Sequence, residues 1–255
     1  MSKARAAGVL AAGFLSLVPA VASAAPVTVD LRVEGRTRTL LERQVTTDVR
    51  TFRFTDAPAT FPCDATGPTG SAAAPSPTRG GALVTAAEEA GVALTGTVGS
   101  FGPTFATVAG EAVGYDAATG AYLVEYENGV PAQFGSCNDA IAQGDEVVFA
   151  YGTGSEPVLR LAAPATAAPG RPVTVRVTDA ASGAGIAGAS VGGATTGTDG
   201  TATVTLTERG PASLKASKPG TIRSNAARTC VTDGADGFCA TAAPAPGADT
   251  AAPGA

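Results

Sequence analysis

Short segments in which apolar and polar residues alternate dominate this chain, and that period suits β-strands rather than helices. In residues 27–33, three valines and one leucine alternate with polar side chains. Residues 173–178 and 202–206 repeat the pattern, with threonine at most of the polar positions. Because a half-buried strand turns every second side chain toward a core, the sequence predicts a mainly β protein.

Residues 82–90 carry the one convincing helical pattern. Leu83, Ala87 and Ala90 share a face, and Gly91 suits the position just past a helix end. Residues 64–81 are rich in Gly, Ala, Pro and Ser and predict a long loop. Further strands are expected near Phe52 and Phe54 and at residues 107–114, 121–127 and 146–151. The order of strand pair, helix, strand pair and final strand predicts an α+β domain of the β-grasp type.

The second half of the chain shows no helical pattern. Residues 162–172 are rich in Ala, Pro and Gly and predict a linker. The short strands and glycine-rich turns beyond it favour an immunoglobulin-like β-sandwich. The predicted organisation is a signal peptide, a β-grasp domain, an Ig-like domain and a disordered Ala/Pro/Gly tail, at residues 1–24, 25–152, 153–240 and 241–255.

The first residues are typical of a secretory leader. Lys3 and Arg5 precede an almost wholly apolar stretch at residues 6–22, and Ala22-Ser23-Ala24 supplies a small-residue cleavage site. The sequence therefore predicts a secreted, extracellular protein, with the cell surface as a second location. No later segment is long and apolar enough to predict a membrane span after cleavage.

Four cysteines in an exported chain indicate two disulfides, for which three pairings exist. We favour Cys63–Cys137 and Cys230–Cys239, since each bridge then stays within one domain. A metal site is not expected, because the chain has no histidine and no Cys-x-x-Cys spacing.

The charge argues against nucleic acid as a partner. Loss of Lys3 and Arg5 with the leader takes the formal net charge from −5 to −7. An acidic chain without a basic run has little with which to neutralise phosphates.

The sequence predicts no catalytic residue and no cofactor. Histidine, the commonest general base, is absent. Residues 188–192 fit the G-x-S-x-G pattern, and Gly183, Gly185 and Gly188 fit the dinucleotide fingerprint. Both patterns require a following helix, and none is predicted there. Asp233 and Asp236 are interpreted as a solvated turn rather than a calcium site.

Glu125 and Glu127 leave the same face of a predicted strand about 7 Å apart, a spacing compatible with a glycosidase pair. We favour the alternative that they form a solvated strand face. Tyr122, Val124 and Tyr126 form the opposite face, interpreted as core. Tyr126 is also a candidate aromatic rim for a ligand, since it lies beside the Asn128-Gly129 turn.

Residues 27–151 resemble the transcobalamin-C-terminal-like β-grasp domain. The resemblance rests on the strand at residues 27–33, the helix near residues 83–90, Tyr126-Glu-Asn-Gly129 and Gly144-Asp-Glu-Val-Val-Phe149. The family often has a tryptophan in the strand before Asn-Gly, and this chain has none. Residues 158–240 resemble exported Ig-like or carboxypeptidase-regulatory-like modules, on residues 186–191 and 198–206.

Two functions are expected, the first from the transcobalamin-like resemblance and the second from the absence of catalytic chemistry, the spacer-like second domain and the Ala/Pro tail. The first is a non-catalytic module that forms the β-domain half of a corrinoid-type small-ligand carrier, with a separate helical-barrel protein as partner. Its expected ligand residues are Tyr122, Tyr126, Asn128 and Gly129. The second is a surface or matrix component that binds cell-surface protein or glycan, with the Ig-like domain as spacer.

Overall fold

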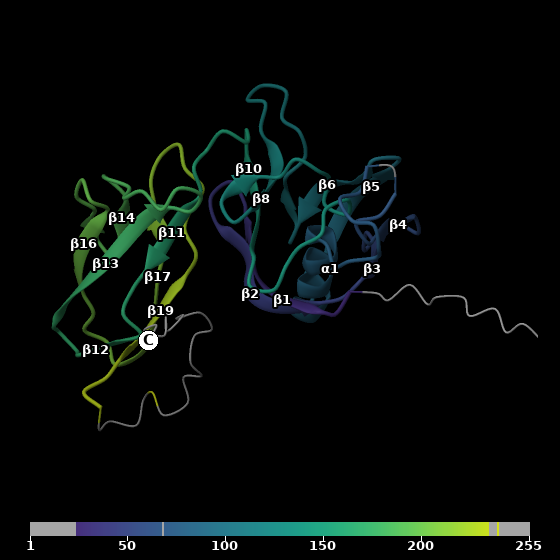
Figure 1. Cartoon of the computed structure of the whole chain (residues 1–255). Coiled ribbons are helices and arrows are strands. Elements are labelled where there is room, and N and C mark those ends of the chain that lie inside the picture. The colour runs from purple at the N-terminus through teal and green to yellow at the C-terminus, as the bar shows by residue number, and fades with distance from the viewer. Residues whose placement is uncertain (1–23, 68, 235–238, 240–255) are drawn as a thin grey trace, which may run out of the picture.

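The computed structural model describes residues 24–67, 69–234 and 239, which form two domains lying side by side (Figure 1). Buried apolar residues form one main core in the N-terminal domain and a separate one in the C-terminal domain. The chain is mainly β, as predicted, with one α-helix in its described part. Within the described ranges, no helix is long and apolar enough to cross a membrane.

The N-terminal domain is built on a mixed five-stranded sheet with the order β2-β1-β10-β8-β9. β1 and β10 run parallel at its centre, and β2 and β8 flank them antiparallel. The strands are β1 (Val27–Glu34), β2 (Thr39–Thr47), β8 (Tyr122–Glu127), β9 (Val130–Pro131) and β10 (Glu146–Gly152). The strands predicted at residues 27–33, 121–127 and 146–151 are confirmed to within one residue.

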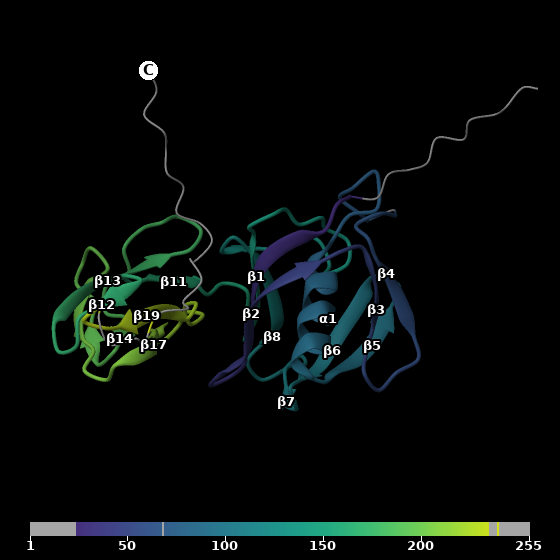
Figure 2. The ribbon, with the colours of Figure 1, turned by 90° about the horizontal axis from the view of Figure 1, so that it is seen from below.

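Helix α1 (Arg79–Ala90) covers one face of this sheet, and two small sheets lie beyond it (Figure 2). Their strands are β3 (Arg50–Arg53), β4 (Thr60–Cys63), β5 (Leu94–Gly99), β6 (Gly102–Val108) and β7 (Glu111–Ala112). Rings of Phe52, Phe54, Phe105 and Phe149 meet edge to face with centroids 4.8–5.9 Å apart. This aromatic cluster belongs to the core between the layers.

α1 begins three residues before the predicted start. The Thr78 side chain accepts a hydrogen bond from the Gly81 amide at 3.1 Å and caps the helix. The helix ends as predicted, because Gly91 adopts the left-handed conformation at φ 64°. The predicted loop at residues 64–81 was therefore too long, since its glycines 80 and 81 are helical.

Both disulfides have the predicted pairing, and both are compatible with an extracellular protein. Cys63–Cys137 spans 74 residues. Constraint of a loop of that length stabilises the fold by about 4 kcal/mol through the unfolded state. A Cβ on Gly80 would lie 2.8 and 2.9 Å from the two sulfurs of this bridge. The first turn of α1 thus needs glycine where it packs on the disulfide.

The C-terminal domain consists of three small sheets with the orders β11-β13-β16, β12-β19-β17 and β15-β14-β18. The predicted strands at residues 173–178 and 202–206 are confirmed in β13 and β16. The strands are β11 (Leu159–Ala162), β12 (Thr166–Ala167), β13 (Pro172–Asp179), β14 (Ser190–Val191), β15 (Ala194–Thr195), β16 (Thr201–Thr205), β17 (Gly210–Leu214), β18 (Ala216–Ser217) and β19 (Ala227–Val231).

The linker predicted at residues 162–172 was wrong. That segment carries β12 and the first residue of β13, and Ala167 is buried within it. The chain instead passes between the domains after β10, where the Glu156 carboxylate accepts bonds from the amides of Thr153 and Gly154. Burial opposes the charge of Glu156, but these amide donors prevail and lower its pKa.

The domains share an apolar interface on the face of the five-stranded sheet opposite α1. Its buried residues are Val124, Tyr126, Val148, Ala150, Val158, Ala180 and Ile222. Ion pairs of 2.7 Å border it: Glu34 binds Lys215 and Arg223, Glu42 binds Lys215, and Glu146 binds Arg160. The Glu34 side chain is 3% exposed, so this contact is buried rather than a solvated pair.

We predict that Glu34→Gln destabilises the protein by about 3–5 kcal/mol, because it removes the buried carboxylate that Arg32, Lys215 and Arg223 share. Urea unfolding of the oxidised protein measures the effect. Glu208→Gln, at an exposed position, is the control and should change the free energy of unfolding by less than about 0.5 kcal/mol. Equal losses for both variants would contradict a structural role for the interface charges.

Candidate functional site

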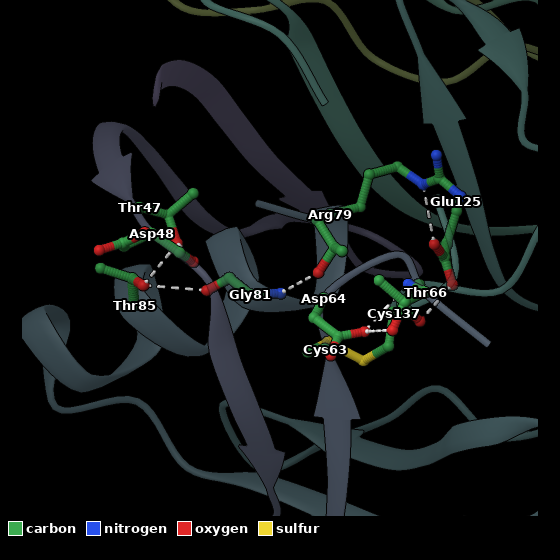
Figure 3. Close-up of a disulfide and its surroundings, with 12 residues drawn as sticks. Thr47, Asp48, Cys63, Asp64, Thr66, Arg79, Gly81, Thr85, Glu125 and Cys137 are labelled. Carbon is green, nitrogen blue, oxygen red and sulfur yellow. Dashed lines mark hydrogen bonds and ion pairs between the residues drawn. A yellow bond between two sulfur atoms is a disulfide. The ribbon is translucent and has the colours of Figure 1, made fainter. Parts of the chain in front are cut away.

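The most buried charge in the N-terminal domain is Arg79, the first residue of α1, whose side chain is fully buried. Its Nε donates to Glu125 at 3.1 Å, and Nη1 donates to Glu127 and to Asp139 at 2.9 Å each. Nη2 donates to the Phe134 carbonyl at 2.8 Å. We call Arg79 and these three carboxylates the arginine cluster; Figure 3 shows Arg79 reaching from the helix to Glu125.

The favoured interpretation of Glu125 and Glu127 as a solvated strand face was wrong. Their face of β8 points toward α1, where Arg79 lies across it, and their side chains are 16% and 28% exposed. The glycosidase alternative is also disfavoured, since both carboxylates bind one arginine. The described residues contain no group of three potential ligands placed to hold a metal ion.

The arginine cluster carries more negative than positive charge, with three carboxylates around one guanidinium. Burial raises the pKa of Glu125, although Arg79 and the Ser136 hydroxyl act to lower it. Burial likewise raises the pKa of Glu127, against the opposing hydrogen bond from Arg79. For Arg79 itself, burial lowers the pKa, but the surrounding carboxylates prevail and raise it.

A groove of about 380 Å³ lies between β6, the segment after β7, and β8. Tyr115 and Tyr122 are exposed at its rim, with 72% and 44% of their surface accessible. We call it the tyrosine groove, and it is lined by Pro103, Thr104, Phe105, Val113, Gly114, Tyr115, Tyr122, Leu123 and Glu125. Its apolar floor is the edge of the main core, since Phe105, Val113 and Leu123 belong to that core.

Large exposed apolar side chains gather in one part of the sequence. Among the described residues they are Phe101, Tyr115, Tyr122, Val130 and Phe134. Two of them line the tyrosine groove, and two others line a second groove of about 220 Å³ beside Arg79. Glu125 and Arg79, which are bonded to each other, each line one of the two grooves. An apolar surface of this kind is a common feature of binding sites.

The structure does not bring the four expected ligand residues together in an open site. Tyr122 lines the tyrosine groove, whereas Tyr126 is fully buried at the domain interface. Burial raises the pKa of Tyr126. Asn128 bonds to Asp145 and to the Glu146 amide, and a Cβ on Gly129 would lie 2.5 Å from the Ala181 nitrogen. The interpretation of Val124 and Tyr126 as core is confirmed.

Other residues singled out from the sequence lie apart from both grooves. Ser190 of the G-x-S-x-G pattern is in β14, with strands rather than a helix around it. Gly183 and Gly188 adopt positive φ values of 72° and 73°, as turn glycines do. Asp233 pairs with Arg209 at 2.7 Å, and Asp236 lies outside the described residues.

Sequence reasoning missed Arg79, Tyr115, Ser136 and Asp139. Arg79 stood in a predicted loop, and only Thr78, a good N-cap residue, signalled that a helix starts there. Tyr115 precedes a turn in which the Gly120 amide donates to the Asp116 carbonyl. Ser136 and Asp139 flank Cys137, and their proximity to Arg79 follows from the disulfide rather than from any local pattern.

Comparison with known proteins gave no match to a family model, to a curated protein or to a solved structure.

We predict that Arg79→Met lowers the free energy of unfolding by about 3–5 kcal/mol, because three partly buried carboxylates lose their counter-charge. The loss should shrink at acid pH as the carboxylates become protonated. Arg38→Met, which removes an ion pair from a side chain that is 60% exposed, should cost less than about 1 kcal/mol. Denaturant unfolding at two pH values measures both. A pH-independent loss for Arg79→Met would contradict the electrostatic account.

A second prediction concerns the raised pKa of Glu125. Above its ordinary value of 4.5, the unfolded chain releases the Glu125 proton while the folded protein still holds it. The contribution of Glu125 to stability is therefore full below that value and is lost as the pH rises through the folded pKa. Glu125→Gln lacks this titration. Stability of the wild type relative to the variant should fall with rising pH in that window, by up to about 1.4 kcal/mol per pH unit. A difference that rises with pH would show that the pKa is lowered.

Proposed function

We propose that this protein is an exported, non-catalytic binding module whose ligand occupies the tyrosine groove. The observation that carries the proposal is an open groove with two exposed tyrosines at its rim and an apolar floor. Tyrosine offers a large rigid surface together with a hydroxyl, which suits it to contacts with a partner. A groove of about 380 Å³ also falls in the size range of ligand sites.

The chemistry around the groove supports binding rather than catalysis. Of the described residues, Glu125 alone lines it with a carboxylate, and both of its oxygens are already bonded, to Arg79 and to Ser136. A general base needs access to the proton it abstracts and a partner nucleophile. This arrangement suits Glu125 to bind a ligand, as a fixed hydrogen-bond acceptor at the edge of an apolar surface.

We infer that the N-terminal domain is a β-grasp domain and the C-terminal domain an Ig-like sandwich. In support, a parallel central strand pair with antiparallel neighbours is crossed by one helix, and the second domain is built of small β-sheets. The buried apolar interface and its ion pairs favour a C-terminal domain that is held rigidly against the N-terminal domain, rather than one that acts as a flexible spacer.

A corrinoid-type ligand with a separate helical-barrel partner is the second candidate, favoured by the same sheet order. Its ligand contacts would have to differ from those expected from the sequence, because Tyr126 and Gly129 pack against the C-terminal domain. Tyr122, on the groove side, is the one of the four expected residues that lines the groove.

The test is a titration of the oxidised, ¹⁵N-labelled protein, followed by amide chemical shifts. The probes are cyanocobalamin, soluble oligosaccharides (cellotetraose and chitotriose), and a short extended peptide with blocked ends. We predict that at least one probe shifts the amide resonances of Tyr115, Tyr122 and Leu123 at lower probe concentrations than it shifts those of other residues. Tyr122→Ala should weaken that binding at least tenfold, since it removes one side of the groove.

Tyr126→Phe is the matched control. The Tyr126 hydroxyl is buried and has no hydrogen-bond partner among the described residues, so its removal should leave binding unchanged. Probe binding that survives Tyr122→Ala, or the absence of groove shifts with every probe, would contradict the proposal. Shifts with cyanocobalamin alone would favour the corrinoid candidate.

A further inference from the structure

We propose that the tyrosine groove binds an extended polypeptide segment, which pairs with the free edge of β8 at Leu123. The inference rests on the proposed function, because it names the occupant of that groove. An extended segment that adds to a sheet edge gains main-chain hydrogen bonds, while alternate side chains enter pockets.

The direction of the β8 backbone groups carries the first step. The Asn128 amide donates to the Glu146 carbonyl at 2.9 Å, and the Ala132 amide donates to the Glu125 carbonyl at 2.9 Å. Even-numbered residues of β8 therefore bond toward β10, and odd-numbered ones point the other way. The amide and carbonyl of Leu123 thus face the groove.

The second step is that this edge is open over a short stretch only. β9 pairs with Tyr126 and Glu127, and the Ala132 amide just after it bonds to the Glu125 carbonyl, so the occupied part of this edge ends at Glu125. At the other end, the Ala121 carbonyl accepts a bond from the Asp116 amide at 2.8 Å. The open edge between Ala121 and Glu125 is about 13 Å long at the rise of a β-strand. It accommodates three to five residues.

The floor of the groove sets the side chain that fits. A residue paired with Leu123 turns its side chain to the same face of the sheet as Leu123. On that face lie Phe105 and Val113, which are buried members of the core. The central residue of the bound segment is therefore apolar.

Charge complementarity sets its neighbours. Glu125 lines the groove, and the arginine cluster behind it has two more negative than positive charges. Basic residues on either side of the apolar residue match this excess, whereas acidic residues repel it.

The probe is acetyl-Lys-Thr-Val-Thr-Lys-amide, added at millimolar concentration to the oxidised, ¹⁵N-labelled full protein. We expect shifts centred on the Leu123 amide. Replacement of both lysines by glutamate should weaken binding at least threefold. A separate set of three peptides carries one N-methyl group each, on Val or on either Thr.

Because backbone groups of an added strand alternate in direction, N-methylation at one position should weaken binding at least tenfold and at a neighbouring position should leave it unchanged. Equal affinity for all three N-methyl peptides would overturn strand pairing. Shifts of Tyr115, Tyr122 and Leu123 by an oligosaccharide or by cyanocobalamin, but not by the peptide, would overturn the polypeptide ligand and leave the binding groove standing. No groove shift with any probe would overturn both proposals.

Discussion

The N-terminal domain depends on the fully buried cation of Arg79. A guanidinium without access to water must be matched by acceptors, because an unpaired buried charge costs several kcal/mol. Arg79 meets this need with two carboxylates from β8, one from the segment after Cys137, and the Phe134 carbonyl. The helix start, strand β8 and the 132–139 loop are thereby held in one arrangement. The disulfide between Cys137 and Cys63 fixes the same loop (Figure 3), and its two sulfurs pack against Gly80.

The opposite face of the same sheet explains why the two domains belong together. A strand whose second face is solvated carries polar residues that need no partner. Here Arg32 and Glu34 occupy that face of β1 and are buried, and Glu34 is neutralised by two cations of the C-terminal domain. Val124 and Tyr126 of β8 are covered in the same way. The N-terminal sheet is thus enclosed on both faces, by α1 and by the second domain.

This double enclosure also marks the limit of prediction from sequence. Period-two alternation located β1, β13 and β16, because it reports which side chains face a core. It could not show that the charged positions of β1 and β8 are buried too, since an ion pair leaves the same pattern as a solvated face. Small residues led to two wrong predictions of irregular structure. Gly80 and Gly81 lie in the first turn of a helix, and the alanine-rich residues 162–172 contain strand residues. The two cysteine pairs were predictable from the assumption that each disulfide stays within one domain.

The candidate site was harder to predict than the fold because the groove lies between elements that are distant in the sequence. Tyr122 was identified through its strand, but the groove beside it exists because β9 ends at Pro131 and β7 turns away to join β6. Proteins usually protect an open strand edge with charged residues, proline or a covering loop. At this edge Glu125 and Pro103 line the groove together with two exposed tyrosines, and the protein's own core forms the floor. Such an edge leaves apolar surface exposed to water, which is unfavourable in free energy. A bound segment that covers the tyrosines and pairs with the Leu123 backbone would remove this cost.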